Sequence, residues 1–96
     1  MINIGDYVCV RARDQGCVLG ILELVSGREC DLAETRQIYN WEKSALTLQD
    51  VILQDPKISK VKLSRVNKKG GRMTEVCGIW HVPDELVEKF KNYTHS

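Results

Sequence analysis

The sequence predicts one α+β domain over residues 1–96, built as a strongly bent, mainly antiparallel five-stranded sheet or a small, partly open barrel with two helices. Three observations predict this class. Apolar and β-branched residues dominate the chain before Trp41, turn residues interrupt them at 14–16 and 26–28, and helix-start signals come only later, at Thr47 and Pro83. The predicted element order is therefore β-β-β-α-β-β-α.

The first two strands are predicted at residues 7–12 and 17–25. Because side chains alternate along a strand, Val8, Val10 and Ala12 share one face of the first strand. The second strand, CVLGILELV, is apolar on both faces, which is typical of a central strand. Gly20 inside it indicates a bulge or a close approach of two backbones.

The third predicted strand, from Glu29 to about Trp41, changes the face that carries its apolar side chains. Cys30 and Leu32 share a face that becomes charged at Glu34. A β-bulge near Ala33 and Glu34 would correct this alternation and bend the strand. We expect a bulge at that point.

Two helices and two strands complete the prediction. Thr47 and Asp50 have the spacing of a capping box, so a short helix is predicted to begin there and to end at Asp55-Pro56. Residues 57–66 alternate apolar and cationic side chains, which predicts a half-buried strand, and a fifth strand is predicted at 73–82 after a loop. Pro83 opens the last helix, whose apolar stripe is Leu86, Val87 and Phe90.

Charge is segregated along the chain although the net charge is only +1. Residues 1–56 carry five basic and nine acidic side chains, residues 57–72 carry seven basic and no acidic ones, and residues 73–96 carry two and four. The net charges of these three segments are therefore −4, +7 and −2. Such asymmetry bears on partners and on association rates more than on the fold.

Composition and cysteine spacing argue against several classes of protein. No apolar run approaches the roughly 20 residues of a membrane span, and the N-terminus does not resemble a signal peptide, so a cytoplasmic protein is expected. Cys9, Cys17, Cys30 and Cys77 are widely spaced, which favours reduced thiols. With only His81 and His95 to supplement them, neither a metal site nor a cofactor is predicted.

Catalysis is not predicted either. Cys77 and His81 fall on one face of the fifth predicted strand, but four residues of extended chain separate them by about 13 Å, beyond hydrogen-bond reach. The sequence contains no nucleophile-elbow, P-loop or metalloprotease motif. We therefore expect a protein that is not an enzyme.

The stretch RQIYNW, residues 36–41, suggests a ligand site. Its aromatic residues and Arg36 each also have a structural interpretation. Tyr39 and Trp41 are predicted on one face, where they either cover the core or form a stacking wall for a ligand. In the ligand hypothesis, Arg28 and Arg36 meet a phosphate or a carboxylate. Alternatively, Arg36 forms a salt bridge with a nearby carboxylate such as Glu34.

The basic segment suggests a second surface. It presents cationic side chains on a predicted hairpin, with Gly70 and Gly71 following in a loop able to expose backbone N–H groups to an anion. The simpler interpretation is an edge strand that lysines protect from aggregation. The candidate partner-binding residues are Lys60, Lys62, Arg65, Lys68, Lys69 and Arg72, preceded in the segment by Lys57.

The stretches QGCVLGILEL and CDLAETRQIYNWEKSALTLQDV resemble a family of small phage and prophage proteins known only as a domain of unknown function. The resemblance covers roughly residues 7–54 and includes a G-x-x-x-G strand and an arginine-led aromatic run ending in Trp41. It departs from that pattern at Asn40, where relatives often carry an aromatic residue, and in the basic segment 57–72. The resemblance implies a phage origin and no catalytic residue.

The expected function is that of a non-catalytic phage accessory protein that acts by binding. A counter-defence factor would sequester a host signalling nucleotide or block a host defence protein, in the host cytoplasm. The alternative is a small nucleic-acid-binding barrel that uses the basic hairpin. Exposed strand edges also lead us to expect a homo-oligomer.

Overall fold

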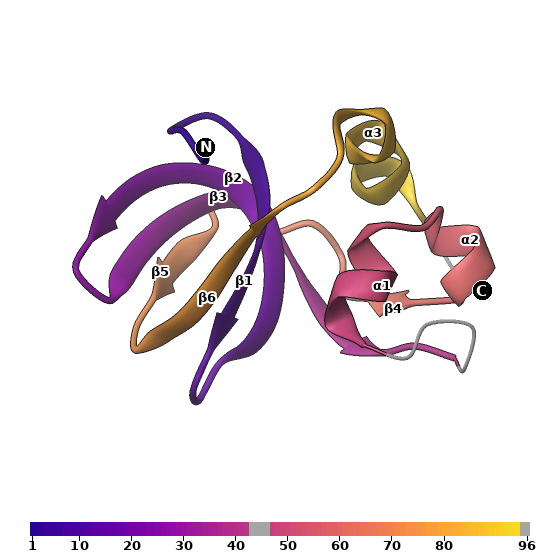
Figure 1. Ribbon diagram of the computed structural model, residues 1–96, viewed down its shortest axis with the longest axis horizontal. Helices are drawn as coiled ribbons and strands as arrows, with labels where there is room; N and C mark the ends of the chain where they lie inside the picture. The colour runs from indigo at the N-terminus through magenta and orange to yellow at the C-terminus, as the bar shows by residue number, and fades with distance from the viewer. Residues whose placement is uncertain (43–46, 95–96) are drawn as a thin grey trace.

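The computed structural model describes residues 1–42 and 47–94. Within them, six strands form one antiparallel sheet in the order β4-β3-β2-β1-β6, and β5 pairs with β3 on the same side as β4 (Figure 1). The strands are β1 (Tyr7–Ala12), β2 (Gly16–Ser26), β3 (Glu29–Asn40), β4 (Lys62–Leu63), β5 (Gly71–Met73) and β6 (Val76–His81). The helices are α1 (Leu48–Ile52), α2 (Pro56–Ser59) and α3 (Asp84–Asn92).

Strands β1, β2 and β3 form the predicted antiparallel meander. The expected bulge is confirmed, because Leu19 pairs with Arg36 whereas Ile21 pairs with Ala33, so β3 uses one residue more than β2 between these pairs. Glu34 adopts a φ of 51° at this point. A side chain at Gly20 would come within 3.0 Å of the Ala33 carbonyl oxygen, so the close backbone approach is confirmed as well.

The helix start at Thr47 is confirmed, but the chain has one helix more than expected. Thr47 and Asp50 form the capping box of α1. The pair Asp55-Pro56 was expected only to end this helix, yet it begins α2, because the Asp55 carboxylate accepts the N–H of Lys57 at 2.9 Å and Pro56 occupies the first helical position. Proline needs no N–H partner there, so the same dipeptide can separate two helices.

The strands predicted at 57–66 and 73–82 are wrong in their extents. Helix α2 takes the start of the first, and Lys60 ends that helix with a φ of 50°, which leaves only Lys62–Leu63 for β4. In the second, a φ of 51° at Glu75 turns the chain between β5 and β6. Each break depends on a left-handed residue other than glycine, which side-chain alternation does not reveal.

The predicted fold class is thus correct as α+β, while the finer architecture is corrected. Within residues 1–42 and 47–94, the sheet has six strands rather than five, and three helices accompany it rather than two. It is neither closed nor strongly curled, and among the described residues no pairing joins its terminal strands β4 and β6. The barrel is therefore not supported, because backbone pairing stops at both edges.

Apolar side chains are buried on both faces of the sheet. On one face, Phe90 and Leu86 of α3 and Val51 of α1 join the side chains of Tyr7 and Leu19. Figure 1 shows the three helices gathered at one end of the sheet. The opposite face buries a second cluster, to which Met73 of β5 contributes: Val8, Val10, Ala12, Val18, Leu22, Cys30 and Leu32.

The predicted alternation in residues 7–12 is confirmed by these two clusters, since Val8 and Val10 lie in one and Tyr7 and Cys9 in the other. The apolar stripe of α3 is confirmed too, with Leu86 and Phe90 buried. In the described part of the chain, no helix combines the length and the hydrophobicity that a membrane span requires.

Candidate functional site

The basic segment lies along the outer edge of β3 rather than in a hairpin, which corrects the prediction. At one end Leu63 pairs with Ile38, and at the other Arg72 pairs with Asp31. Between these ends, an isolated bridge joins Asn67 to Thr35. Residues 62–72 therefore follow β3 antiparallel for most of its length, a distance of up to about 30 Å for an extended strand.

Side chains and glycine complete this edge where the ladder is interrupted. The Ser64 hydroxyl accepts the N–H of Gln37 at 2.8 Å and donates to the carbonyl of Arg65 at 2.9 Å. Gly70, with a φ of +69°, packs directly against the Leu32 carbonyl, where a Cβ atom would overlap it. The segment is thus held to β3 by the Ser64 hydroxyl and by a close contact that requires glycine at residue 70.

We define the basic edge as the cationic side chains of this segment: Lys62, Arg65, Lys68, Lys69 and Arg72. All five are exposed. Arg72 forms a bidentate ion pair with Asp31, at 2.7 and 3.2 Å. In the described part of the chain, no carboxylate lies within ion-pair distance of the other four, which leaves their charges available to a partner.

Two cations of residues 57–72 lie apart from this edge: Lys57 and the predicted partner residue Lys60. Lys57 is the second residue of α2, and Lys60 caps the end of that helix, with its ammonium 3.9 Å from the Glu42 carboxylate and both of these side chains exposed. An exposed pair of that length contributes little to stability. The seven cations of residues 57–72 therefore divide between a helix and a sheet edge, which a linear charge count could not show.

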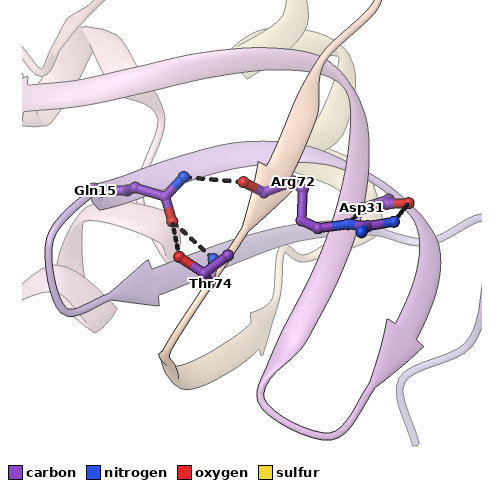
Figure 2. Close-up of polar contacts among 4 residues, drawn as sticks. All are labelled: Gln15, Asp31, Arg72 and Thr74. Atoms are coloured by element: carbon purple, nitrogen blue, oxygen red, sulfur yellow. Dashed lines mark hydrogen bonds and ion pairs between the residues drawn. The ribbon is translucent and has the colours of Figure 1, made fainter.

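Side-chain hydrogen bonds of Gln15 hold one end of the basic edge, and the sequence did not predict this role of Gln15 (Figure 2). The Gln15 amide donates from Nε2 to the Arg72 carbonyl at 2.9 Å and accepts the Thr74 N–H at 2.7 Å through Oε1. One side chain thereby replaces two backbone partners that a neighbouring strand would supply. Together with the Asp31 pair, it fixes the backbone and the side chain of Arg72.

The four predicted ligand residues do not form one site. Arg28 lies in the turn between β2 and β3, whereas Tyr39 lies at the far end of β3 and Trp41 just beyond it. Tyr39 is 59% exposed, but Trp41 packs against the cluster beneath the helices, so the two aromatics do not form a wall. Only the interpretation of Trp41 as a core residue agrees with this placement.

Arg36 is buried, with 5% of its surface exposed, and it is engaged within the fold. Its Nε donates to the Ser64 carbonyl at 2.8 Å, and its Nη1 donates to the carbonyls of Phe90 and Tyr93, both at 2.7 Å. Burial lowers the pKa of the Arg36 guanidinium, and the nearby Tyr7 and Tyr93 oppose this shift. The salt bridge to Glu34 considered from the sequence is replaced by these three carbonyl contacts.

Three of the four cysteines have thiols with raised pKa values. Burial raises the pKa of the Cys9 thiol to about 12, and burial also raises the pKa of Cys17 and of Cys30, so these thiols stay protonated. Cys77 contacts the carbonyl of Glu75, while His81 lies 3.2 Å from the Asp6 carboxylate.

Metal-binding geometry is equally absent from the described residues, which hold no cluster of three or more His, Cys, Asp or Glu side chains suited to a metal ion. His95, the second histidine considered from the sequence, lies outside the described residues.

Comparison with protein-family models assigns the chain to a family. Residues 5–90 match the family described as Domain of unknown function (DUF6948), so the chain belongs to that family. No match was found among curated proteins or among solved structures. The expected domain of unknown function is thus confirmed, whereas a phage origin is not shown.

Proposed function

We propose that this member of the DUF6948 family acts by binding single-stranded nucleic acid along its basic edge, without catalysing a reaction. The observation that carries the proposal is the row of four cations without carboxylate partners beside β3: Lys62, Arg65, Lys68 and Lys69. Phosphate groups are the anions that such a row contacts most readily in series.

The charge of the rest of the chain supports a directed contact. The segments on either side of residues 57–72 carry −4 and −2. A polyanion is repelled by those segments and attracted to the basic edge, which orients the encounter. The exposed cations also match the simpler role of protecting an edge strand, so binding must be measured directly.

A single strand fits this edge better than a duplex does. The segment that carries the cations is irregular between β4 and β5, so its cations do not follow a regular repeat. A flexible single strand can adjust to such an arrangement, and its bases can stack on an exposed aromatic ring. Tyr39 offers that ring next to Asn40, the residue of β3 that pairs with Lys62.

Fluorescence anisotropy with a labelled oligonucleotide of about 16 nucleotides tests this proposal. If four phosphates are neutralised, the logarithm of the association constant should fall with the logarithm of salt concentration with a slope of about −3. Replacing Lys68 and Lys69 together by glutamate should abolish binding. The matched control is Arg11→Glu, which reverses an exposed charge on β1, two strands away from β3.

Absence of binding at low salt would exclude the proposal, and so would equal loss of affinity in the Arg11→Glu control. If the double variant still binds the oligonucleotide, the nucleic acid contacts another part of the chain.

The resemblance to phage proteins motivates a different candidate, a counter-defence factor that blocks a host protein. Its structural support is the same basic edge, which an acidic protein surface could cover in place of nucleic acid. Affinity capture from lysate with and without nuclease separates the two. Recovery of a protein that resists nuclease and is lost in the Lys68, Lys69 double variant would favour the protein partner.

A further inference from the structure

A second candidate site lies on the helix side of the sheet, in a cavity of about 600 Å³. Its wall is built by β1, by β3 next to its bulge, by the loop before β5 and by α3, which contribute Tyr7, Arg36, Lys68 and Lys91. This volume is within the range of small-molecule pockets. The cavity shares Lys68 with the basic edge but is otherwise a separate place.

Arg36 is held in a fixed orientation at this cavity. Three backbone carbonyls occupy its Nε and Nη1, whereas Nη2 has no hydrogen-bond partner among the described residues. The guanidinium is therefore oriented before a ligand arrives, with one donor group still available. A planar donor fixed in this way suits a phosphate oxygen.

Tyr7 provides an independent indication that the cavity is incomplete without a ligand. Its side chain is 5% exposed, and its hydroxyl is buried without a hydrogen-bond partner in the described structure. Burial raises the pKa of Tyr7, so the hydroxyl keeps its proton and remains a donor. The Lys91 ammonium lies over the Tyr7 ring, 5.6 Å from its centre, so a cation contacts the same side chain.

Unpartnered buried hydroxyls are rare in folded proteins because they lose their hydrogen bond to water and gain nothing in return. Tyr7 is close enough to Arg36 and Glu34 for both charges to act on its ionisation. Tyr7, Arg36 and Lys91 all line this cavity.

Two carboxylates restrict which anion the cavity can take. Glu34 and Glu88 also line it, and Glu88 accepts a hydrogen bond from Asn92 at 3.3 Å. Three cations against two carboxylates do not favour a bare phosphate. They favour a ligand with a phosphate at one end and hydrogen-bond donors at the other, because a carboxylate accepts from the N–H groups of a base.

We propose that this cavity binds a guanosine mononucleotide, with its phosphate held by Lys68, Lys91 and the Nη2 group of Arg36 and its base facing Glu34 or Glu88. Guanine presents two adjacent donor groups, which suit a carboxylate acceptor. Lys68 belongs to both sites, but the two proposals can be tested separately, because Lys91 belongs only to the cavity and Lys62 only to the edge.

Thermal shift and isothermal titration with GMP, UMP and inorganic phosphate test this inference. GMP should raise the melting temperature and bind at least tenfold more tightly than UMP or phosphate. Lys91→Gln should remove most of the GMP-induced shift, whereas Lys62→Gln should leave it unchanged. If phosphate alone stabilises as well as GMP does, or if GMP causes no shift, the proposal is wrong.

Tyr7→Phe supplies a second readout that a purely structural role would not give. Removing an unpartnered buried hydroxyl should raise the melting temperature of the free protein. The same variant should weaken GMP binding severalfold if the hydroxyl contacts the ligand. Unchanged GMP affinity in both Tyr7→Phe and Lys91→Gln would overturn the site, and neither result depends on whether oligonucleotides bind the edge.

Discussion

The Arg36 guanidinium ties the end of helix α3 to the sheet. The last carbonyls of a helix have no partner within the helix, and a cation near them also interacts favourably with the helix dipole. Arg36 satisfies the carbonyl of Phe90, and beyond the helix that of Tyr93. Arg36 belongs to β3, and both carbonyls belong to the C-terminal region. One side chain therefore joins parts of the chain that are 54 and 57 residues apart.

Replacing Arg36 by methionine should destabilise the fold by about 3 kcal/mol, since it keeps an unbranched apolar chain but leaves buried carbonyls without donors. Urea denaturation followed by circular dichroism measures this difference. Arg65→Met, at an exposed position, is the control and should change stability by less than about 0.5 kcal/mol. Equal stability of the two variants would show that the carbonyls find other partners.

At the scale of elements, the packing of residues 62–72 against β3 requires Gly70 but not the adjacent Gly71. Gly70 has a positive φ and lies against the Leu32 carbonyl, whereas an added Cβ at Gly71 would meet nothing within 4 Å. The two residues are adjacent in the chain but differ in both backbone conformation and surroundings. Sequence reasoning treated the pair only as a loop that could present N–H groups.

Gly70→Ala should therefore cost about 3 kcal/mol, from the strained φ and from displacement of β5 away from β3. Gly71→Ala should stay within about 0.5 kcal/mol of the parent. Chemical denaturation gives both values, and hydrogen exchange at the amides of β5 should accelerate only in the first variant. A similar loss in both would contradict the assignment of the close contact to Gly70.

Across the whole molecule, two ion pairs connect elements that are distant in sequence. Arg72 on β5 holds the Asp31 carboxylate and lowers its pKa. The Lys57 N–H, followed by the Lys89 ammonium at 3.0 Å, lowers the pKa of Asp55, which joins α2 to α3. Both carboxylates thus have folded-state pKa values below their ordinary 3.8.

Each depressed pKa contributes stability that is complete above pH 3.8 and is lost as pH falls through the folded-state value. A double variant, Asp31→Asn with Asp55→Asn, should therefore melt below the parent at pH 7, and the gap should close under acidic conditions. Asparagine still caps a helix, so the charge is the main change at residue 55.

Melting curves between pH 7 and pH 2 measure this gap. The control is Asp14→Asn in the turn after β1, because Asp14 joins no ion pair in the described residues. A gap that stays constant over this range, or one equally large in the control, would show that the two pairs contribute nothing through their charges.

Local sequence patterns predicted those features of the fold that depend only on residues close together in the chain. Alternation assigned the two faces of β1, the spacing of Thr47 and Asp50 located α1, and the phase change in β3 located the bulge at Glu34. These features follow from backbone geometry over three or four residues. The charge counts likewise identified the basic segment, because composition needs no structure.

Long-range contacts governed the remaining features. The sequence could not show that Arg36 would be buried under α3, that Gln15 would clasp a strand 57 residues away, or that the basic segment would lie along β3. Such contacts arise only when packing brings distant residues together, and no periodic pattern records which donor meets which carbonyl. Local sequence thus specified the first three strands, the cap of α1 and the charged segment, whereas packing decided which side chains are buried and which remain exposed.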